Sequence, residues 1–489
     1  MDVERVRREK LARLRAAGVF PYPAGLHRSH TLAEVRRGWD GLAAGEESAD
    51  VVRVAGRIVL RRVMGKLAFW TLRHGDDELQ AMLTVGALGD DQFAVVTDLD
   101  VGDWVAVQGP VVRTRKGELS VKPTEVVLLG KGLRPLPDKW KGLHDVEVRS
   151  RQRELDLVVN PETRTAARLR IDVVQSLRQS MLSRGYLEVE TPILNPVPGG
   201  ALARPFVTHH NALDTDLYLR VACELYLKRL LVGGMDRVFE LGRVFRNEGI
   251  DSTHNTEFTM LESNAAFEDY RDMMVLARGV ILEAADNAVG ARRVTYRGAE
   301  IDLDAPWTEV TLLDAVRGEL GEPNLAYDRP LDEVRKLCDR FGVGWEPGWG
   351  TGKLVLELYE KHVERAIVQP TFVTDYPVEV SPLAHPHRDD PTVTERFELI
   401  IAGREYANCF SELTDPDEQR ARLEEQALAK AGGDEEAMVV DEAYLRALEL
   451  GLPPNAGLGV GVDRLVMLLG GLTSIREALL FPQLRPEEY

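Results

Sequence analysis

Residues 239–264 read FELGRVFRNEGIDSTHNTEFTMLESN and predict two strands joined by a polar loop. The first strand is expected over 238–246 and the second over 257–261, because both stretches mix apolar and charged residues as strands do. The segment between them is polar and contains Gly249, a residue typical of turns. The run therefore predicts a hairpin whose two arms belong to one sheet.

One face of the second strand carries chemically useful side chains. Side chains alternate along a strand, so Phe258, Met260 and Glu262 share a face, and Asn264 joins them if the strand continues. Arg246, at the end of the first strand, has a planar set of donors that suits a phosphate. Phe258 can stack on a base and Glu262 can bind an ammonium. The hairpin favours a nucleotide site, and the alternative is a surface hairpin with solvated charges.

The composition is that of a globular protein. The 489 residues suggest about two to four domains, with 44% hydrophobic and 29% charged residues. No apolar run approaches the roughly 20 residues that span a bilayer, and the charged N-terminus lacks the apolar core of a signal peptide. We therefore expect a cytoplasmic protein without membrane contact. Three widely spaced cysteines, Cys223, Cys338 and Cys409, are expected to be buried free thiols rather than a disulfide framework.

The charge balance bears on nucleic-acid binding. A net charge of −18 argues against a generic nucleic-acid binder, which is usually basic, but it does not exclude local contact with RNA. Residues 1–50 predict a helical extension with helices over 2–18 and 31–37. The first helix carries six basic residues that form either an RNA-binding patch or a solvated helix face: Arg5, Arg7, Arg8, Lys10, Arg13 and Arg15.

Residues 51–132 predict a small β-barrel. Five strand-like runs are separated by Gly and Asp turns, with a helix near 89–97, which fits a Greek-key barrel of the OB type. Such barrels bind oligonucleotides by stacking bases on aromatic side chains beside basic groups. Arg61, Phe69 and Gln80 lie on the first three strands and suit that use. The alternative is that Phe69 belongs to the core and Gln80 is an ordinary surface residue.

The remaining chain, 151–489, follows a linker over 133–150 that is rich in Pro, Gly and charge. Its longest helix is predicted for 161–184, with apolar residues at helical spacing, Pro161 near its start and Gly185 just past its end. Strand and helix signals then alternate to the C-terminus. The chain as a whole predicts an α+β protein with a separate N-terminal barrel.

Several runs in 151–489 resemble the motifs of class II aminoacyl-tRNA synthetases, and in detail those of the lysyl enzymes. The resemblance implies an OB-fold anticodon-binding domain, in which Arg61, Phe69 and Gln80 read the anticodon. It also implies a catalytic domain built on an antiparallel sheet flanked by helices, and a homodimer formed through the helix at 161–184 and the strand after it. The runs are FRNEG with the His and EF that follow it, GYLEVETPIL (185–194), GGALARPF (199–206), ELYLKRLLVGG (224–234), FSEL (410–413) and GLGVGVDRL (457–465).

The same resemblance implies how ATP and Mg²⁺ are bound. Arg246 would bridge the substrate carboxylate and the α-phosphate, and Arg464 would meet the γ-phosphate, so these arginines are the expected catalytic residues. Glu398 and Glu405 lie on consecutive predicted strands and would hold Mg²⁺, although alone they could be surface carboxylates. The residues expected to bind ATP are Arg246, Glu248, His254, Phe258, Glu398 and Arg464.

An amino-acid pocket is implied beside the nucleotide. Three of its members, Glu224, Glu262 and Glu412, are carboxylates that repel one another in an empty site, and a substrate with two ammonium groups relieves that repulsion. The charges therefore favour a diamino acid, with its α-ammonium on Glu262 and its side-chain ammonium on Glu412. The expected pocket residues are Gly200, Glu224, Arg246, Glu262, Asn264, Asn408, Phe410 and Glu412.

The pocket departs from the family pattern. Asn264 stands where the family has Tyr, which leaves space, and Cys223, Thr256 and Cys409 replace Pro, Pro and Gly. The expected function is ATP-dependent activation of lysine and its transfer to lysine tRNA. The alternatives are a paralogue that activates a modified lysine or β-lysine, and a non-catalytic regulator that binds tRNA. A ligase that loads an amino acid onto a protein would generally lack the barrel.

Overall fold

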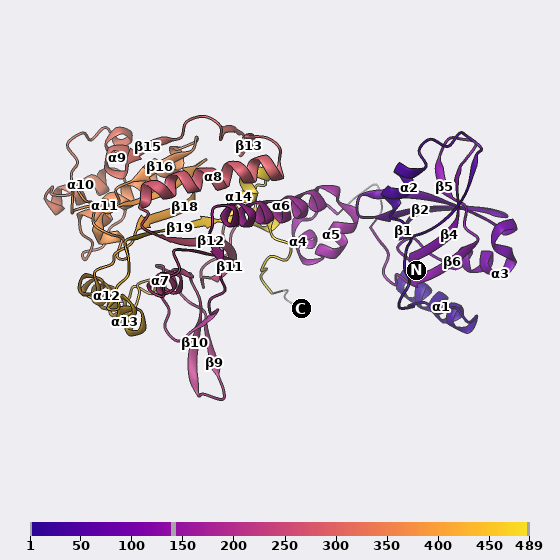
Figure 1. Ribbon diagram of the computed structural model, residues 1–489, viewed down its shortest axis with the longest axis horizontal. Coiled ribbons are helices and arrows are strands. Elements are labelled where there is room, and N and C mark those ends of the chain that lie inside the picture. The colour runs from indigo at the N-terminus through magenta and orange to yellow at the C-terminus, as the bar shows by residue number, and fades with distance from the viewer. Residues whose placement is uncertain (1, 138–142, 487–489) are drawn as a thin grey trace. The chain divides into compact units, whose positions relative to one another are not determined.

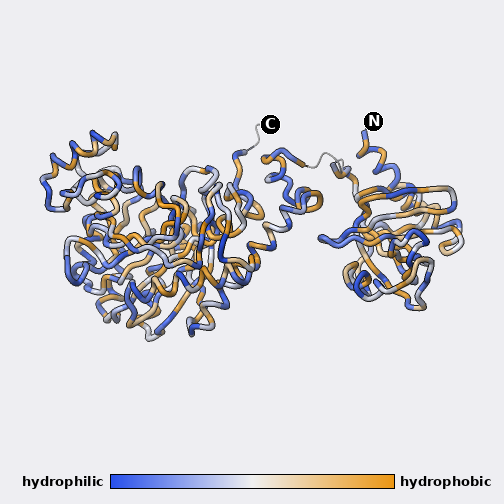
Figure 2. The backbone as a smooth tube through the Cα atoms, turned by 90° about the horizontal axis from the view of Figure 1, so that it is seen from above, coloured by the Kyte–Doolittle hydropathy of each residue, from blue (hydrophilic) through white to orange (hydrophobic). Residues whose placement is uncertain are grey.

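The computed structural model describes residues 2–137 and 143–486. It divides into two compact units, Met1–Arg164 and Thr165–Tyr489. The linker expected at 133–150 includes residues 138–142, which lie outside the described residues, and its end already forms the helix α4 (Val146–Arg151). Figure 2 shows apolar segments interrupted by polar ones along both units. No described helix is long and apolar enough to cross a membrane.

The first unit is built on a closed barrel, which confirms the predicted OB-type architecture. The strand order is β1-β2-β3-β5-β4-β6, and β1 closes the barrel by pairing with β4. Six strands form instead of five because Pro123, which has no N–H for a ladder, separates the last expected strand into two. The elements are β1 (Glu47–Met64), β2 (Leu67–His74), β3 (Asp77–Thr84), α3 (Val85–Asp98), β4 (Trp104–Arg113), β5 (Leu119–Val121) and β6 (Glu125–Gly130), followed by α4 and α5 (Arg153–Val159).

Helix α1 (Val3–Ala16) is held to the rest of its unit by three of its basic residues, of which Arg13 pairs with Asp98 of α3 at 3.3 Å. Arg7 donates to the backbone oxygens of residues 101, 132 and 134, and Lys10 donates to Asp100 at 2.5 Å. Arg5 and Arg8 pair with glutamates one turn away on the same helix. The six basic residues therefore do not form one exposed patch. The second helix, α2 (Leu32–Gly38), begins after Thr31, which caps it as expected.

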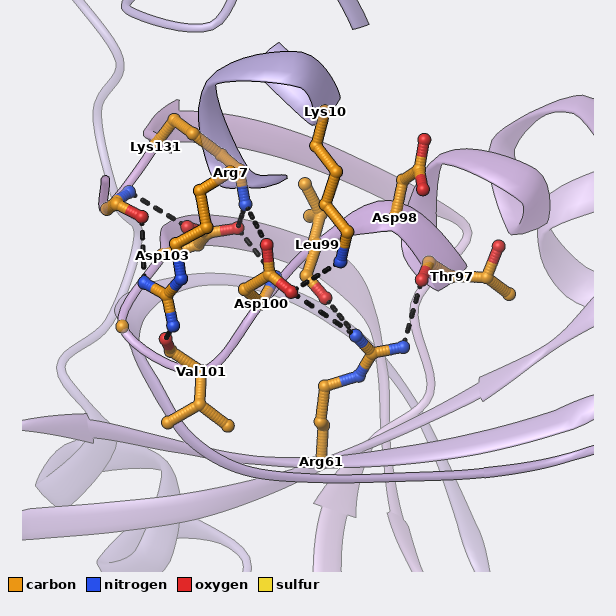
Figure 3. Close-up of polar contacts among 12 residues, drawn as sticks. Arg7, Lys10, Arg61, Thr97, Asp98, Leu99, Asp100, Val101, Asp103 and Lys131 are labelled. Carbon is orange, nitrogen blue, oxygen red and sulfur yellow. Dashed lines mark hydrogen bonds and ion pairs between the residues drawn. The ribbon is translucent and has the colours of Figure 1, made fainter. Parts of the chain in front are cut away.

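A buried ionic cluster lies beneath α1 (Figure 3). The Lys131 side chain is 0% exposed and its ammonium donates to Asp100 at 2.6 Å and Asp103 at 2.8 Å. Burying an ammonium is costly unless carboxylates compensate its charge. Lys131 and the two aspartates therefore compensate one another's charges, and removing one leaves the others uncompensated.

The second unit is built on an eight-stranded sheet in the order β15-β16-β17-β18-β19-β12-β11-β7. Neighbouring strands are antiparallel except for the β15–β16 and β11–β7 pairs, which confirms the predicted antiparallel sheet. The strands are β7 (Leu187–Glu188), β11 (Arg237–Phe245), β12 (Glu257–Ala266), β15 (Thr308–Thr311), β16 (Thr371–Thr374), β17 (Arg396–Ile401), β18 (Arg404–Ser411) and β19 (Asn455–Gly461). Smaller sheets are formed by β8 (Leu194–Asn195), β9 (Val207–His210) and β10 (Thr215–Leu219), and by β13 (Arg293–Tyr296) and β14 (Ala299–Asp302).

Helices cover both faces of this sheet (Figure 1). α6, α8 and α14 share one apolar cluster with the sheet, whereas α7 and α13 contribute to a second cluster. All three cysteines are buried and free, as expected. The helices are α6 (Pro161–Ser183), α7 (Glu224–Val232), α8 (Tyr270–Ala288), α9 (Leu312–Leu320), α10 (Leu331–Arg340), α11 (Thr351–Leu358), α12 (Pro416–Ala431), α13 (Glu442–Leu448), α14 (Val462–Gly470) and α15 (Ile475–Ala478).

The ionic cluster of the barrel yields a stability prediction. Lys131→Met leaves Asp100 and Asp103 without their buried partner, so we expect the free energy of unfolding to fall by about 3–5 kcal/mol. Denaturant unfolding followed by circular dichroism measures this loss. Lys122→Met is the control, because Lys122 pairs with Glu47 at the surface and should change stability by less than about 1 kcal/mol. Equal losses in the two variants would contradict the prediction.

Candidate active site

The site is organised by β12, which pairs with β11 on one side and β19 on the other. The expected alternation holds, and β12 continues far enough for Asn264 to join Phe258, Met260 and Glu262 along the cavities described below. In the register with β19, Glu262 lies opposite Gly459 and Asn264 lies opposite Gly457. The strand that carries Glu262 and Asn264 and the glycine-rich strand β19 are far apart in sequence, and they lie side by side in the sheet.

The first cavity brings together most of the residues expected to bind ATP. It is lined by Arg246, Glu248, His254, Phe258 and Arg464, together with Glu405. The Arg246 guanidinium lies 5.1 Å from the centre of the Phe258 ring, which fixes the cation beside the aromatic face. Glu398, the remaining expected ATP ligand, lines a neighbouring cavity instead.

His254 and Arg464 are each held in this cavity by a carboxylate, His254 from the β11–β12 loop and Arg464 from the start of α14. The His254 ring lies 2.9 Å from Asp251, whose pKa is lowered below its usual range because hydrogen bonds from His254 and Thr253 outweigh the effect of burial. Arg464 donates to the backbone oxygen of Glu405 at 2.7 Å and to its carboxylate at 3.2 Å. A carboxylate and an arginine are thus already paired where phosphates and a metal are expected.

Glu398 and Glu405 line one cavity together with Arg246, Arg396 and Asn408. Arg396 donates to Glu398 at 2.7 Å and to the Asn408 side-chain oxygen at 3.2 Å. Burial, followed by repulsion from Glu405, raises the pKa of Glu398 above its ordinary value. Among the described residues, no group of three or more His, Cys, Asp or Glu is placed to hold a metal by itself.

The third cavity contains all eight residues expected in the amino-acid pocket: Gly200, Glu224, Arg246, Glu262, Asn264, Asn408, Phe410 and Glu412. Glu262 accepts a hydrogen bond from the Cys223 N–H at 2.6 Å. Burial raises the pKa of Glu262 to about 7, with Glu224 adding to that effect and the Cys223 N–H opposing it. The Asn264 amide donates to Glu412 at 2.9 Å and to Asn455 at 3.2 Å.

The three cavities meet at two residues. Arg246 and Glu405 line all of them, so one guanidinium reaches both the nucleotide cavity and the amino-acid pocket. That position suits a cation that must contact two reactants at once. The Arg246 Nε is buried without a hydrogen-bond partner among the described residues, as expected for a group placed to bind a ligand.

Sequence reasoning missed several residues that hold the site in place. Lys228 is buried between Glu224 and Glu412, and its spacing of four residues from Glu224 on a helix was the available signal. Asp463 pairs with Arg170 of α6 and accepts the Thr259 N–H at 2.7 Å. No local pattern predicts the Arg170 contact, because its partner lies almost 300 residues away in the chain.

The three residues expected to read an anticodon lie on the first three strands of the barrel, β1, β2 and β3. Phe69 and Gln80 lie on the outer face of the barrel, where Phe69 pairs with Met82 and Gln80 accepts a hydrogen bond from Ser120. Arg61 lies opposite the buried Trp70, and its guanidinium donates to the backbone oxygens of Thr97 and Leu99 (Figure 3). The assignment of these three residues to reading an anticodon stays a prediction.

Comparison with known proteins gives the same division of the chain. Residues 145–485 match the family model described as tRNA synthetases class II (D, K and N), and residues 52–129 match an OB-fold nucleic acid binding domain. A lysine–tRNA ligase from Moorella thermoacetica is 46% identical over 489 residues, covering 100% of this chain and 98% of the relative. The lysine–tRNA ligase of Xylella fastidiosa is 49% identical over 487 residues, covering 98% and 96%.

A third relative extends the range of organisms. The lysine–tRNA ligase of Nostoc punctiforme is 48% identical over 495 residues, covering 99% of this chain and 88% of the relative. These relatives match nearly the whole chain, and the family model covers most of it. The matches therefore show the family of the chain and not only its fold. The chain belongs to the class II tRNA synthetases of the D, K and N group.

Proposed function

We propose that this chain activates lysine with ATP and transfers the lysyl group to a lysine tRNA. The observation that carries the proposal is the meeting of a nucleotide cavity and a three-carboxylate pocket at Arg246. The names of the full-length relatives agree with it. A pocket that contains Glu224, Glu262 and Glu412 selects a substrate with two ammonium groups, which distinguishes lysine from aspartate and asparagine.

The first step joins the lysine carboxylate to the α-phosphorus of ATP. A new carboxylate–phosphorus bond forms, the bond from the α-phosphorus to the bridging oxygen breaks, and pyrophosphate leaves with the electron pair. Arg246 would hold both reactants and offset the charge that develops on the phosphate, and no protein nucleophile is needed. In the second step a ribose hydroxyl of the tRNA attacks the lysyl carbonyl and AMP leaves.

The nucleotide would be held by groups on opposite sides of its cavity. Phe258 would stack on the adenine, Arg464 would meet the γ-phosphate, and Glu248 and His254 would contact ATP from the loop between β11 and β12. Arg464 already contacts Glu405, so phosphate binding would replace or share that contact. This pairing keeps a cation in place before the nucleotide arrives.

Glu398 and Glu405 would hold Mg²⁺ in the same region. Both line one cavity, and two carboxylates together with phosphate oxygens are a donor set that this ion prefers. When bound, Mg²⁺ would neutralise phosphate charge and orient the leaving pyrophosphate. Because Arg396 donates to Glu398, that arginine would orient the carboxylate toward the ion.

Lysine would lie along the third cavity. Glu262 would receive its α-ammonium and Glu412 its side-chain ammonium. Arg396 donates to the side-chain oxygen of Asn408, so the Asn408 nitrogen is the atom that would donate to the lysine carboxylate. The other expected pocket residues, Gly200 and Phe410, line the same cavity.

A related diamino acid, such as a modified lysine or β-lysine, is the second candidate substrate. It is favoured by Asn264, a small residue that lines the pocket and donates to Glu412. The intact set of ATP residues makes a non-catalytic, tRNA-binding regulator the weaker alternative. The tRNA would be bound in part by the barrel, with Arg61, Phe69 and Gln80 on its first three strands.

Pyrophosphate exchange tests the proposed activity directly. With ATP and labelled pyrophosphate, we expect lysine to support exchange and aspartate or asparagine to support none, because their side chains cannot pair with Glu412. Lysine tRNA should then become charged. Exchange only with another diamino acid would make the chain a paralogue with a changed substrate, and no exchange with any amino acid would contradict the proposal.

The pocket predicts a dependence on pH. Glu262 has a pKa raised to about 7 by burial, so it is protonated below that pH and cannot pair with the α-ammonium. We expect the KM for lysine to rise as pH falls from 7.5 to 6, by up to about tenfold per pH unit, and the KM for ATP to report separately on Glu398, whose pKa is also raised by burial. Steady-state exchange kinetics at fixed ionic strength measure both constants. Glu262→Gln should raise the lysine KM and weaken its pH dependence, leaving the part that comes from Glu412, whose pKa is also raised by burial; a flat profile in the unmodified protein would contradict the assignment.

We also propose a homodimer formed through α6 and the strand after it. Ile171 and Leu182 of α6 are 49% and 42% exposed, and Leu187 of β7 is 54% exposed, so this face carries apolar side chains that a partner would cover. Ile171→Asp should give monomers in analytical ultracentrifugation at concentrations where the unmodified protein is dimeric. Val275→Asp is the matched control, because Val275 is an exposed apolar residue of α8. A monomeric unmodified protein would contradict this proposal.

A further inference from the structure

Lys228 is a buried lysine behind the amino-acid pocket, where it contacts Glu224 and Glu412; the part of the pocket that these two carboxylates line is called its closed end. It lies on α7, its side chain is 0% exposed, and its ammonium donates to Glu224 at 2.5 Å. The same ammonium forms an ion pair with Glu412. It also lies 5.5 Å from the Phe410 ring centre and 5.8 Å from that of Tyr444. A charged group of the chain therefore lies between two of the three pocket carboxylates.

The surroundings of Lys228 keep its charge in place. Burial opposes the charge, but Glu224 and Glu412 outweigh burial and hold the pKa of Lys228 above its ordinary value. An ammonium without water is tolerated only with such partners. Conversely, burial raises the pKa of Glu412, and the Lys228 ammonium and the Asn264 amide counteract that rise. Lys228 and Glu412 thus each help the other to stay charged.

The charges of the pocket balance only if Lys228 is counted. Glu224, Glu262 and Glu412 contribute three negative charges, and Lys228 and Arg246 contribute two positive ones; Glu405 also lines the cavity, but its charge is compensated by Arg464 outside it. A bound lysine adds two ammonium groups and one carboxylate, which brings the total to zero. At the closed end alone, Glu224, Glu412 and Lys228 leave one negative charge for one ammonium.

We propose that Lys228 is a positioning residue that sets this charge, so that the closed end of the pocket accepts a single ammonium from the substrate. The inference rests on the proposed function and deepens it. Lys228 acts through Glu412: its ammonium is paired with one carboxylate oxygen of Glu412, and Asn264 donates to the other. Both oxygens are oriented by the chain before the substrate arrives.

The neighbouring backbone leaves room for this arrangement. A Cβ added to Gly457 of β19 would overlap the Glu412 carboxylate and the Asn264 amide, so only glycine fits beside them. The titratable groups facing Glu412 are Lys228 and Glu224 from α7, Tyr444 from α13 and Cys409 from β18. The pKa values of Tyr444 and Cys409 are raised by burial, so both stay neutral at physiological pH and leave the charge to the Lys and Glu residues.

Four variants test the charge count. Lys228→Met removes the ammonium and keeps the length of the side chain, and Lys228→Arg keeps the charge. The double variant Lys228→Met/Glu224→Gln removes one charge of each sign and restores a single negative charge at the closed end. Lys131→Met is the matched control, because Lys131 is also 0% exposed and bridges two carboxylates, but it lies in the barrel.

Pyrophosphate exchange is measured from pH 6 to 9 for lysine and for ATP. In Lys228→Met, Glu412 should keep its proton to a higher pH. The pH at which the lysine KM falls should therefore be higher by about one pH unit than in the unmodified protein. At neutral pH that shift raises the lysine KM about tenfold, with the ATP KM changed less than about twofold. Lys228→Arg and the double variant should return the profile toward that of the unmodified protein, and Lys131→Met should leave it unchanged.

A melting experiment needs no substrate and separates this inference from the proposed function. Protonation of Glu412 stabilises the folded Lys228→Met variant at lower pH, because the folded state then binds more protons than the unfolded state. The melting temperature of Lys228→Met should therefore fall more steeply than that of the unmodified protein as pH rises from 6 to 9. The double variant should lose that excess slope.

Different results overturn different claims. If the unmodified protein uses no lysine, the proposed function is wrong, and the melting slopes still decide the charge count. If Lys228→Met keeps the lysine profile of the unmodified protein, or binds lysine more tightly, the inference is wrong, because Lys228 is then a spectator or a competitor of the substrate. A double variant that behaves like Lys228→Met would assign the effect to packing and also overturn it.

Discussion

The antiparallel pairing of β12 with both β11 and β19 is the constraint on which the site depends. It places Glu262 beside Gly459 and Asn264 beside Gly457, and it brings Arg246 at the end of β11 to the same cavities. A one-residue slip in this register would turn every pocket side chain of β12 to the opposite face. The apolar clusters on the two faces of the sheet oppose such a slip, because they use the alternate residues of the same strands.

Buried ion pairs fix the parts of the second unit that surround this sheet. Asp463, which precedes Arg464, is held by Arg170 and Thr259, so the start of α14 is tied to α6 and β12. Glu240 of β11 pairs with the buried Arg220. Each pair consists of charges that would be costly if left alone, so each fixes one relative position of two segments. Residues on those segments that would bind the substrates, such as Arg464, are thereby held in position by these neighbouring ion pairs.

Much of this arrangement could be predicted from the sequence, and the remainder has identifiable causes. The hairpin, the barrel and the long helix α6 follow from local periodicity, whereas the eight pocket residues follow only from the resemblance to a known family. The hydrogen bonds from the Arg61 guanidinium to the carbonyls of residues 97 and 99 could not be predicted, because strand alternation does not reveal them. Lys228 lies within the run 224–234, but that run alone does not predict its role, because the role depends on Glu412, which is distant in sequence. Such tertiary pairings between charged residues leave no local pattern.

The contacts of Arg7 have a consequence for synthesis of the chain on the ribosome. This residue of the first helix donates to the backbone of Gly132 and Arg134, which are made more than a hundred residues later. At about 5–20 residues per second, the first helix must wait several seconds for its docking partners. Helix α1 is thus translated well before the segments that hold it in place. Until then its apolar residues, Leu11 and Leu14, are available to chaperones that bind nascent chains.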